Sequence, residues 1–308
     1  MQGGQTGPRS FGQVLDGAFS IYTRRFLPLA RIAALVWIPL IVALILIDLY
    51  RFADLPGVGN DNYFVGDTIR ALDTTRIVVG SGLLAILYLI GFLLVVGASL
   101  RAASQAYLGE AVEVGASIRS AARRIVSMLW VVLLLAIFIG IPAALFIFIL
   151  PGVLAIYLTI IWILALPALL LEDRRGFKAL GRSNGLVKDY WWRTLGIVIV
   201  IAIFTSIIGG LIPALIGDAF QGISADNFTL WVVLTDIVSG IGFIITAPLW
   251  AATITAMYYD LRVRKEGFDV EMMVRQLAEP GSEGLPSSSE PLGPGSGASG
   301  PPPPAPAA

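Results

Sequence analysis

The chain has 308 residues, with 21 lysines and arginines against 21 aspartates and glutamates, and it is 56% hydrophobic but only 14% charged. Soluble domains hold about 25% charged residues, so this composition and the mean hydropathy of +0.82 predict an integral membrane protein. The chain lacks cysteine and histidine, which excludes disulfides, thiolate metal sites and the usual general base near neutral pH. We expect no enzymatic activity, no cofactor, no metal and no nucleic-acid partner.

The N-terminal segment predicts a short disordered start, residues 1–9, followed by an amphipathic helix. Ser10 and Gln13 have the spacing of a capping box, which marks the start of the helix. Apolar residues then recur every third or fourth position and share one helical face. These residues are Phe11, Val14, Leu15, Ala18, Phe19, Tyr22 and Phe26.

Six apolar runs are long enough to cross a membrane, because roughly 20 helical residues span the bilayer core. We expect the spans at about 27–49, 77–100, 125–148, 152–171, 194–216 and 229–257. The third and fourth divide a stretch of 47 residues, 125–171, that has no charged side chain, and Pro151 and Gly152 mark the turn.

The spans pair into three hairpins, each preceded by an amphipathic segment, in repeats of about 10–110, 111–172 and 173–264. The first span of each pair contains an Ile-Pro step, at Pro39, Pro142 and Pro213. The second closes near an acid, at Glu110, Glu172 and Asp260. The sequence therefore predicts an all-α polytopic membrane domain over residues 10–275.

Lysine and arginine gather at one end of the predicted spans, where the amphipathic segments lie. The opposite end carries only Arg51, Arg70 and Arg76. Because positive residues favour the cytoplasmic face, we expect a bacterial inner-membrane protein with both termini cytoplasmic.

Basic and aromatic residues at the three junctions are candidate contacts for anionic lipid headgroups, since tryptophan favours the headgroup level. They are Arg24, Arg25, Arg123, Arg124, Arg182, Lys188, Trp191, Trp192 and Arg193. Two alternatives stay open: the amphipathic segments pack on one another as a soluble cap, or the positive charges only set topology during insertion.

Asp236 is a candidate intramembrane polar site, because ionisable groups within spans are costly and tend to mark pathways or pairings. A structural role and a role in transport or proton coupling both fit it. The tail, residues 276–308, is rich in proline, glycine and serine and predicts disorder, with a polyproline contact to a protein partner as the alternative.

Several short motifs resemble the bacterial family named for the membrane domain of glycerophosphoryl diester phosphodiesterase. They lie at 167–172, 179–183 and 192–196, with similar segments at the start, 11–26, and the close, 258–262. The resemblance covers roughly residues 10–275. In the two-part enzymes of that family catalysis sits in an attached soluble barrel, so the resemblance implies a membrane module without that barrel.

These observations predict an accessory or membrane-organising module that works through cytoplasmic-face amphipathic helices. The alternative is a small-solute transporter or channel with a path through the helix bundle. The predicted spans hold few polar residues besides Asp236, which favours the accessory role.

Overall fold

The computed structural model describes residues 9–51, 74–145, 149–223 and 228–267. The chain divides into two compact units, Met1–Phe268 and Asp269–Ala308, and the described residues all belong to the first unit. The predicted disordered tail, 276–308, lies outside the described residues, as does the predicted disordered start except for Arg9.

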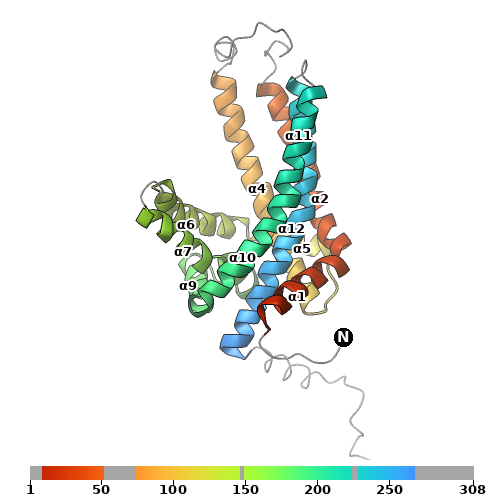
Figure 1. The fold of residues 1–308 in the computed structure, drawn as a ribbon. Helices are drawn as coiled ribbons and strands as arrows, with labels where there is room; N and C mark the ends of the chain where they lie inside the picture. Colours follow the sequence, from red (N-terminus) through yellow and green to blue (C-terminus); the bar gives the residue numbers. More distant parts are fainter. Residues whose placement is uncertain (1–8, 52–73, 146–148, 224–227, 268–308) are drawn as a thin grey trace, which may run out of the picture. The chain divides into compact units, whose positions relative to one another are not determined.

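Every element within the described residues is a helix (Figure 1). The elements are α1 (Phe11–Arg24), α2 (Phe26–Arg51), α4 (Thr74–Tyr107), α5 (Val114–Arg123), α6 (Ile125–Ala144), α7 (Ile149–Ile161), α8 (Ala165–Glu172), α9 (Phe177–Val187), η1 (Lys188–Tyr190), α10 (Trp191–Ser206), η2 (Ile207–Leu211), α11 (Ile212–Ile223) and α12 (Phe228–Glu266). Among them are 6 helical stretches long and apolar enough to cross a membrane. The predicted all-α polytopic fold, with three hairpins each preceded by an amphipathic helix, is confirmed.

The start of α1 follows the predicted capping box. Ser10 Oγ accepts a hydrogen bond from the Gln13 amide at 3.3 Å, and Gln13 Oε1 accepts one from the Ser10 amide at 2.7 Å. The helix then buries Val14 and Ala18 against the protein core. Its Tyr22 hydroxyl donates to the Ile245 carbonyl of α12 at 3.2 Å, and burial raises the pKa of this phenol above its ordinary value.

The predicted fourth span is broken into α7 and α8. Residues 162–164 form a turn between the two helices, and Pro167 sits in the first turn of α8, where its missing N–H costs little. Ser183 of α9 closes the break: its hydroxyl donates to the Ile161 carbonyl at 2.7 Å and accepts from the Leu164 amide at 3.1 Å. A buried side chain from another helix thus satisfies backbone groups that the break exposes.

The predicted fifth span also changes its winding. Five residues, Ile207–Leu211, form a π-helical turn (η2) between α10 and α11, just before Pro213. Proline has no N–H to donate and displaces the preceding turn, and such π-helical turns are frequent at functional sites. By contrast, α12 continues as an α-helix through Pro248.

One end of the helix group is densely packed, and we call it the base. It is formed by α1, α5, α8, α9 and residues 251–266 of α12, and Figure 1 shows α1, α5 and α9 at this same end. Residues 251–261 of α12 are all buried there. The opposite end, where α2 ends and α12 begins, we call the far end.

The amphipathic helices turn their apolar faces mainly toward protein. Ala179, Leu180, Leu186 and Val187 of α9 are buried in the same core as the base of α12. Any contact with lipid at the base is therefore made by the exposed rims of these helices. Large apolar side chains also stay exposed along the spans, as at Leu35, Leu46 and Leu150, as expected for surfaces that face lipid tails.

Candidate functional site

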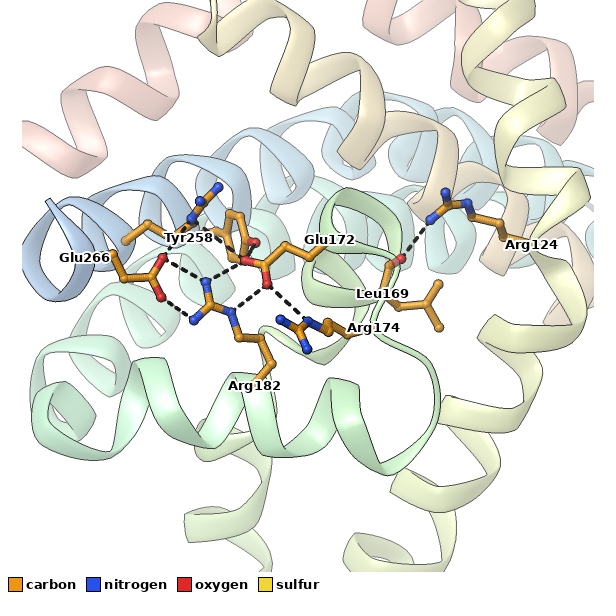
Figure 2. Close-up of polar contacts among 8 residues, drawn as sticks. Arg124, Leu169, Glu172, Arg174, Arg182, Tyr258 and Glu266 are labelled. Atoms are coloured by element: carbon orange, nitrogen blue, oxygen red, sulfur yellow. Dashed lines mark hydrogen bonds and ion pairs between the residues drawn. The ribbon is translucent and has the colours of Figure 1, made fainter. Parts of the chain in front are cut away.

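Glu172, the last residue of α8, is the hub of an ion-pair cluster at the base (Figure 2). Its carboxylate accepts hydrogen bonds from Arg182 Nε at 2.7 Å and Nη2 at 2.6 Å, and another from the Tyr258 hydroxyl. Arg182 also pairs with Glu266, with Nη2 2.9 Å from Oε2. Because an arginine fork holds planar carboxylates in defined geometry, this cluster ties α8 and α9 to the end of α12.

Asp260 of α12 is a second hub, and its side chain is fully buried. The carboxylate accepts from the Arg9 backbone amide at 2.9 Å and from Arg264 Nε at 3.0 Å, and it pairs with Arg193. Arg193 also donates through Nη2 to the Arg9 carbonyl at 2.7 Å. The start of the described chain, the start of α10 and the end of α12 are thus joined at one buried charge.

Arg124 caps the C-terminal end of α8. Its Nη1 donates to the Leu169 carbonyl at 2.9 Å and to the Leu170 carbonyl at 3.2 Å, and it lies 3.2 Å from Asp173 Oδ1. Figure 2 shows the bond to Leu169. The last carbonyls of a helix have no partner within the helix, and Asp173, with φ of 54°, ends α8 in the left-handed conformation.

The predicted headgroup contacts therefore fall into different environments. Arg124, Arg182 and Arg193 are held by acceptors of the protein itself. The other basic candidates are exposed and, among the described residues, have no hydrogen-bonding or ion-pair partner for their side chains: Arg24, Arg25, Arg123 and Lys188. The sequence pattern had marked Glu172 and Asp260, the acids that hold Arg182 and Arg193, but only as landmarks of the repeat.

Residues 188–193, at the junction of α9, η1 and α10, form an aromatic segment that we call the elbow. Trp191 Nε1 donates to the Tyr157 carbonyl of α7 at 3.3 Å, and the two rings stack with centroids 5.9 Å apart. Trp192 meets Trp191 edge to face and is 79% exposed. From α12, Lys265 holds Asp189 at 2.7 Å, so the elbow is fixed from two sides.

A cavity of about 610 Å³ lies between this elbow and α7. Its walls are mostly apolar and aromatic, from Val153, Ile156 and Tyr157 of α7 and from Trp192 of α10. Lys188 lines the same cavity, and its ammonium has no ion-pair partner within the described part of the chain. The arrangement combines an apolar wall, an exposed tryptophan and the charged side chains of Lys188 and Asp189, of which Asp189 is paired with Lys265.

Asp236, the predicted intramembrane site, lies near the far end, about two turns after the start of α12. It lines two neighbouring cavities, together with Tyr88 and Leu44 in both. Asp48 of α2 faces its carboxyl group, a contact that local sequence patterns do not reveal because 188 positions separate the two residues. Asp48 itself pairs with Arg51 at 2.6 Å.

The described residues contain no group of three or more metal-ligating side chains close enough to hold a metal ion. The acids at the base, Glu172 and Asp260, are instead occupied by arginines.

Fold and sites together define a polytopic helical membrane protein with an ion-paired base. A family model described as a domain of unknown function, DUF8558, matches residues 112–252, from just before α5 to the middle of α12. No curated protein and no solved structure matches the chain.

Proposed function

We propose that the protein is a membrane-embedded accessory module without catalysis of its own, which holds anionic phospholipid at its base. The observation that carries the proposal is the elbow cavity, where Lys188 stands unpaired beside an apolar wall that ends in the exposed Trp192. The likeness of the sequence to the phosphodiesterase membrane family fits such a module but assigns no ligand.

A phospholipid has a charged headgroup and apolar acyl chains. Its phosphate needs a positive partner and its acyl chains need an apolar wall, so a cavity that offers both side by side suits a phospholipid. Each basic residue near an anionic leaflet contributes about 1 kcal/mol of attraction. Tryptophan settles at the headgroup level because its ring is apolar and its N–H is polar.

The other unpaired cations of the base extend this surface. Arg119 is exposed and, within the described ranges, unpaired, like Arg24, Arg25 and Arg123. Under the positive-inside rule, this end faces the cytoplasm in a bacterial inner membrane. The base would then meet the anionic inner leaflet. The arginines that are paired with acids would hold the helices in place, and the unpaired arginines would contact lipid.

A transporter or channel for a small solute is the second candidate. The observation that favours it is the pair of cavities beside Asp236, which lie within the spans. The accessory function is preferred because a lipid-binding surface needs no path through the packed base.

Retention of phospholipid by the purified full-length protein tests the lipid proposal. Native mass spectrometry would count bound phosphatidylglycerol and phosphatidylcholine after mild delipidation of the wild type, Lys188→Gln and Lys178→Gln. Both variants remove one exposed lysine of the base, but only Lys188 lines the cavity. We expect phosphatidylglycerol retention to fall about fivefold in Lys188→Gln, which corresponds to about 1 kcal/mol, and to be unchanged in Lys178→Gln. Equal retention by the two variants would contradict a site at the elbow.

A further inference from the structure

The far end of the helix group holds a cavity that the lipid proposal does not use. It measures about 450 Å³ and lies between α2, α4, the α10–η2 segment and α12, a volume in the range of small-ligand sites. Its lining includes Trp37, Tyr88, Thr205, Asp236, Phe243 and Thr246. The π-helical turn η2 contributes Gly209 and Gly210, so the winding change after α10 lies at the cavity wall.

The charge at this cavity is negative and incompletely matched within it. Asp236 Oδ2 is buried and has no hydrogen-bond partner among the described residues. Asp48 faces the same carboxyl group and already pairs with Arg51. Two carboxyl groups this close in a low-dielectric setting call for a proton or a cation between or beside them.

Two threonine hydroxyl groups line another part of the cavity, since Thr246 lies ten residues, about 15 Å, further along α12 than Asp236. Thr205 Oγ1 donates its proton to the Ile201 carbonyl at 2.9 Å, and Thr246 Oγ1 donates to the Gly242 carbonyl at 2.9 Å. A hydroxyl has one proton and two lone pairs, so both oxygens present only lone pairs to the cavity. A ligand that extends along the cavity could donate hydrogen bonds to these oxygens.

Aromatic rings supply the rest of the wall. Trp37 stacks on Phe243 with ring centroids 4.0 Å apart, and Tyr88 meets Trp37 edge to face at 5.3 Å. Ring faces attract cations, and most strongly where water is excluded. The close approach of α2 to α12 needs Gly240, because a Cβ there would lie 2.2 Å from Ile41 Cδ1. This small residue lets Trp37 reach the cavity.

We propose that this cavity binds a primary ammonium group, carried by a small amine or by an aminolipid headgroup. The –NH₃⁺ group offers donors for the unpartnered oxygen of Asp236, and its positive charge suits the two neighbouring carboxyl groups. A quaternary ammonium has the charge but no donor, and a neutral alcohol has a donor but no charge. The neighbouring cavity of about 610 Å³, lined by Leu84, Leu89 and Phe92, has room for an alkyl chain.

Isothermal titration of the full-length protein in phosphatidylcholine nanodiscs tests this site. The probes are butylammonium, tetramethylammonium and butanol, and the variants are Asp236→Asn and Asp16→Asn. Asp16 is exposed on α1 at the base, so its variant repeats the charge change away from the cavity. We expect saturable binding of butylammonium, at least tenfold weaker binding of the other two probes, and at least a tenfold loss in Asp236→Asn but not in Asp16→Asn.

The wild-type selectivity keeps the proposal testable even if Asp236→Asn fails to fold. Absent binding of butylammonium, or binding of tetramethylammonium with equal affinity, overturns the proposal, as does unchanged affinity in a folded Asp236→Asn protein. Replacing part of the phosphatidylcholine by phosphatidylethanolamine distinguishes the two sources. Competition that weakens butylammonium binding identifies the lipid headgroup as the occupant, and unchanged affinity identifies a soluble amine.

Discussion

Substituting asparagine for Asp260 should destabilise the base strongly, because it removes the charge that opposes two arginines. The side chain of Asp260 is fully buried, whereas those of Arg193 and Arg264 keep 16% and 19% of their exposure. Removing one partner of a buried ion pair costs about 3–5 kcal/mol. Asparagine keeps the volume and one acceptor oxygen for the Arg9 amide, and both arginines retain some solvent. We therefore expect a loss at the lower end, about 3 kcal/mol, or over a hundredfold in the unfolding equilibrium.

Steric-trap unfolding in bicelles measures this free energy for the wild type and for each variant. Asp16→Asn is the control, because it makes the same change at an exposed position without a side-chain ion pair among the described residues, and we expect a change within about 0.5 kcal/mol. The double variant Asp260→Asn with Arg193→Gln should lose less than the sum of the two single changes, since it also removes an uncompensated cation. If Asp260→Asn costs no more than Asp16→Asn, the ion pairs of the base do not hold it together.

Two further predictions follow from the fold. Ser183→Ala leaves the Ile161 carbonyl and the Leu164 amide at the α7–α8 break without their partner, so it should lower the free energy of unfolding by about 1–3 kcal/mol. The same unfolding assay applies, with Ser127→Ala in α6 as the control. Equal losses in the two variants would mean that other groups satisfy the backbone at the break. The chain has no native cysteine, so an impermeant thiol reagent applied to intact cells should label Asp226→Cys but not Lys178→Cys if the base is cytoplasmic. The reverse labelling pattern would invert the proposed orientation.

Local sequence patterns predicted much of the fold. Span number follows from the length of apolar runs, and the amphipathic helices follow from apolar residues at helical spacing. The capping box at Ser10 and Gln13 was found because it involves neighbours in sequence, and the structure has both of its bonds. The break in the fourth span was not predicted, since the side chain that satisfies its backbone groups, Ser183, lies in the next helix.

The role of individual charges was much harder to predict. Lys188 and Arg182 are six positions apart and look alike in sequence, yet Lys188 is exposed and Arg182 is shared between Glu172 and Glu266. An arginine pairs with whatever acid the fold brings within a few ångströms, and that acid can be 84 positions away. Sequence spacing carries no information about such a distance.

The sequence by itself determined that this chain has six spans apolar enough for a membrane, where those spans begin to within a few residues, and which end concentrates positive charge. Each of these depends on length, composition or helical period, which act along the chain. Only the tertiary structure decided which of the described arginines are held by acids and that Asp48 faces Asp236 beside a cavity. Those outcomes depend on how α2, α8, α9 and α12 pack, because packing brings distant side chains together and removes the water that would otherwise screen them.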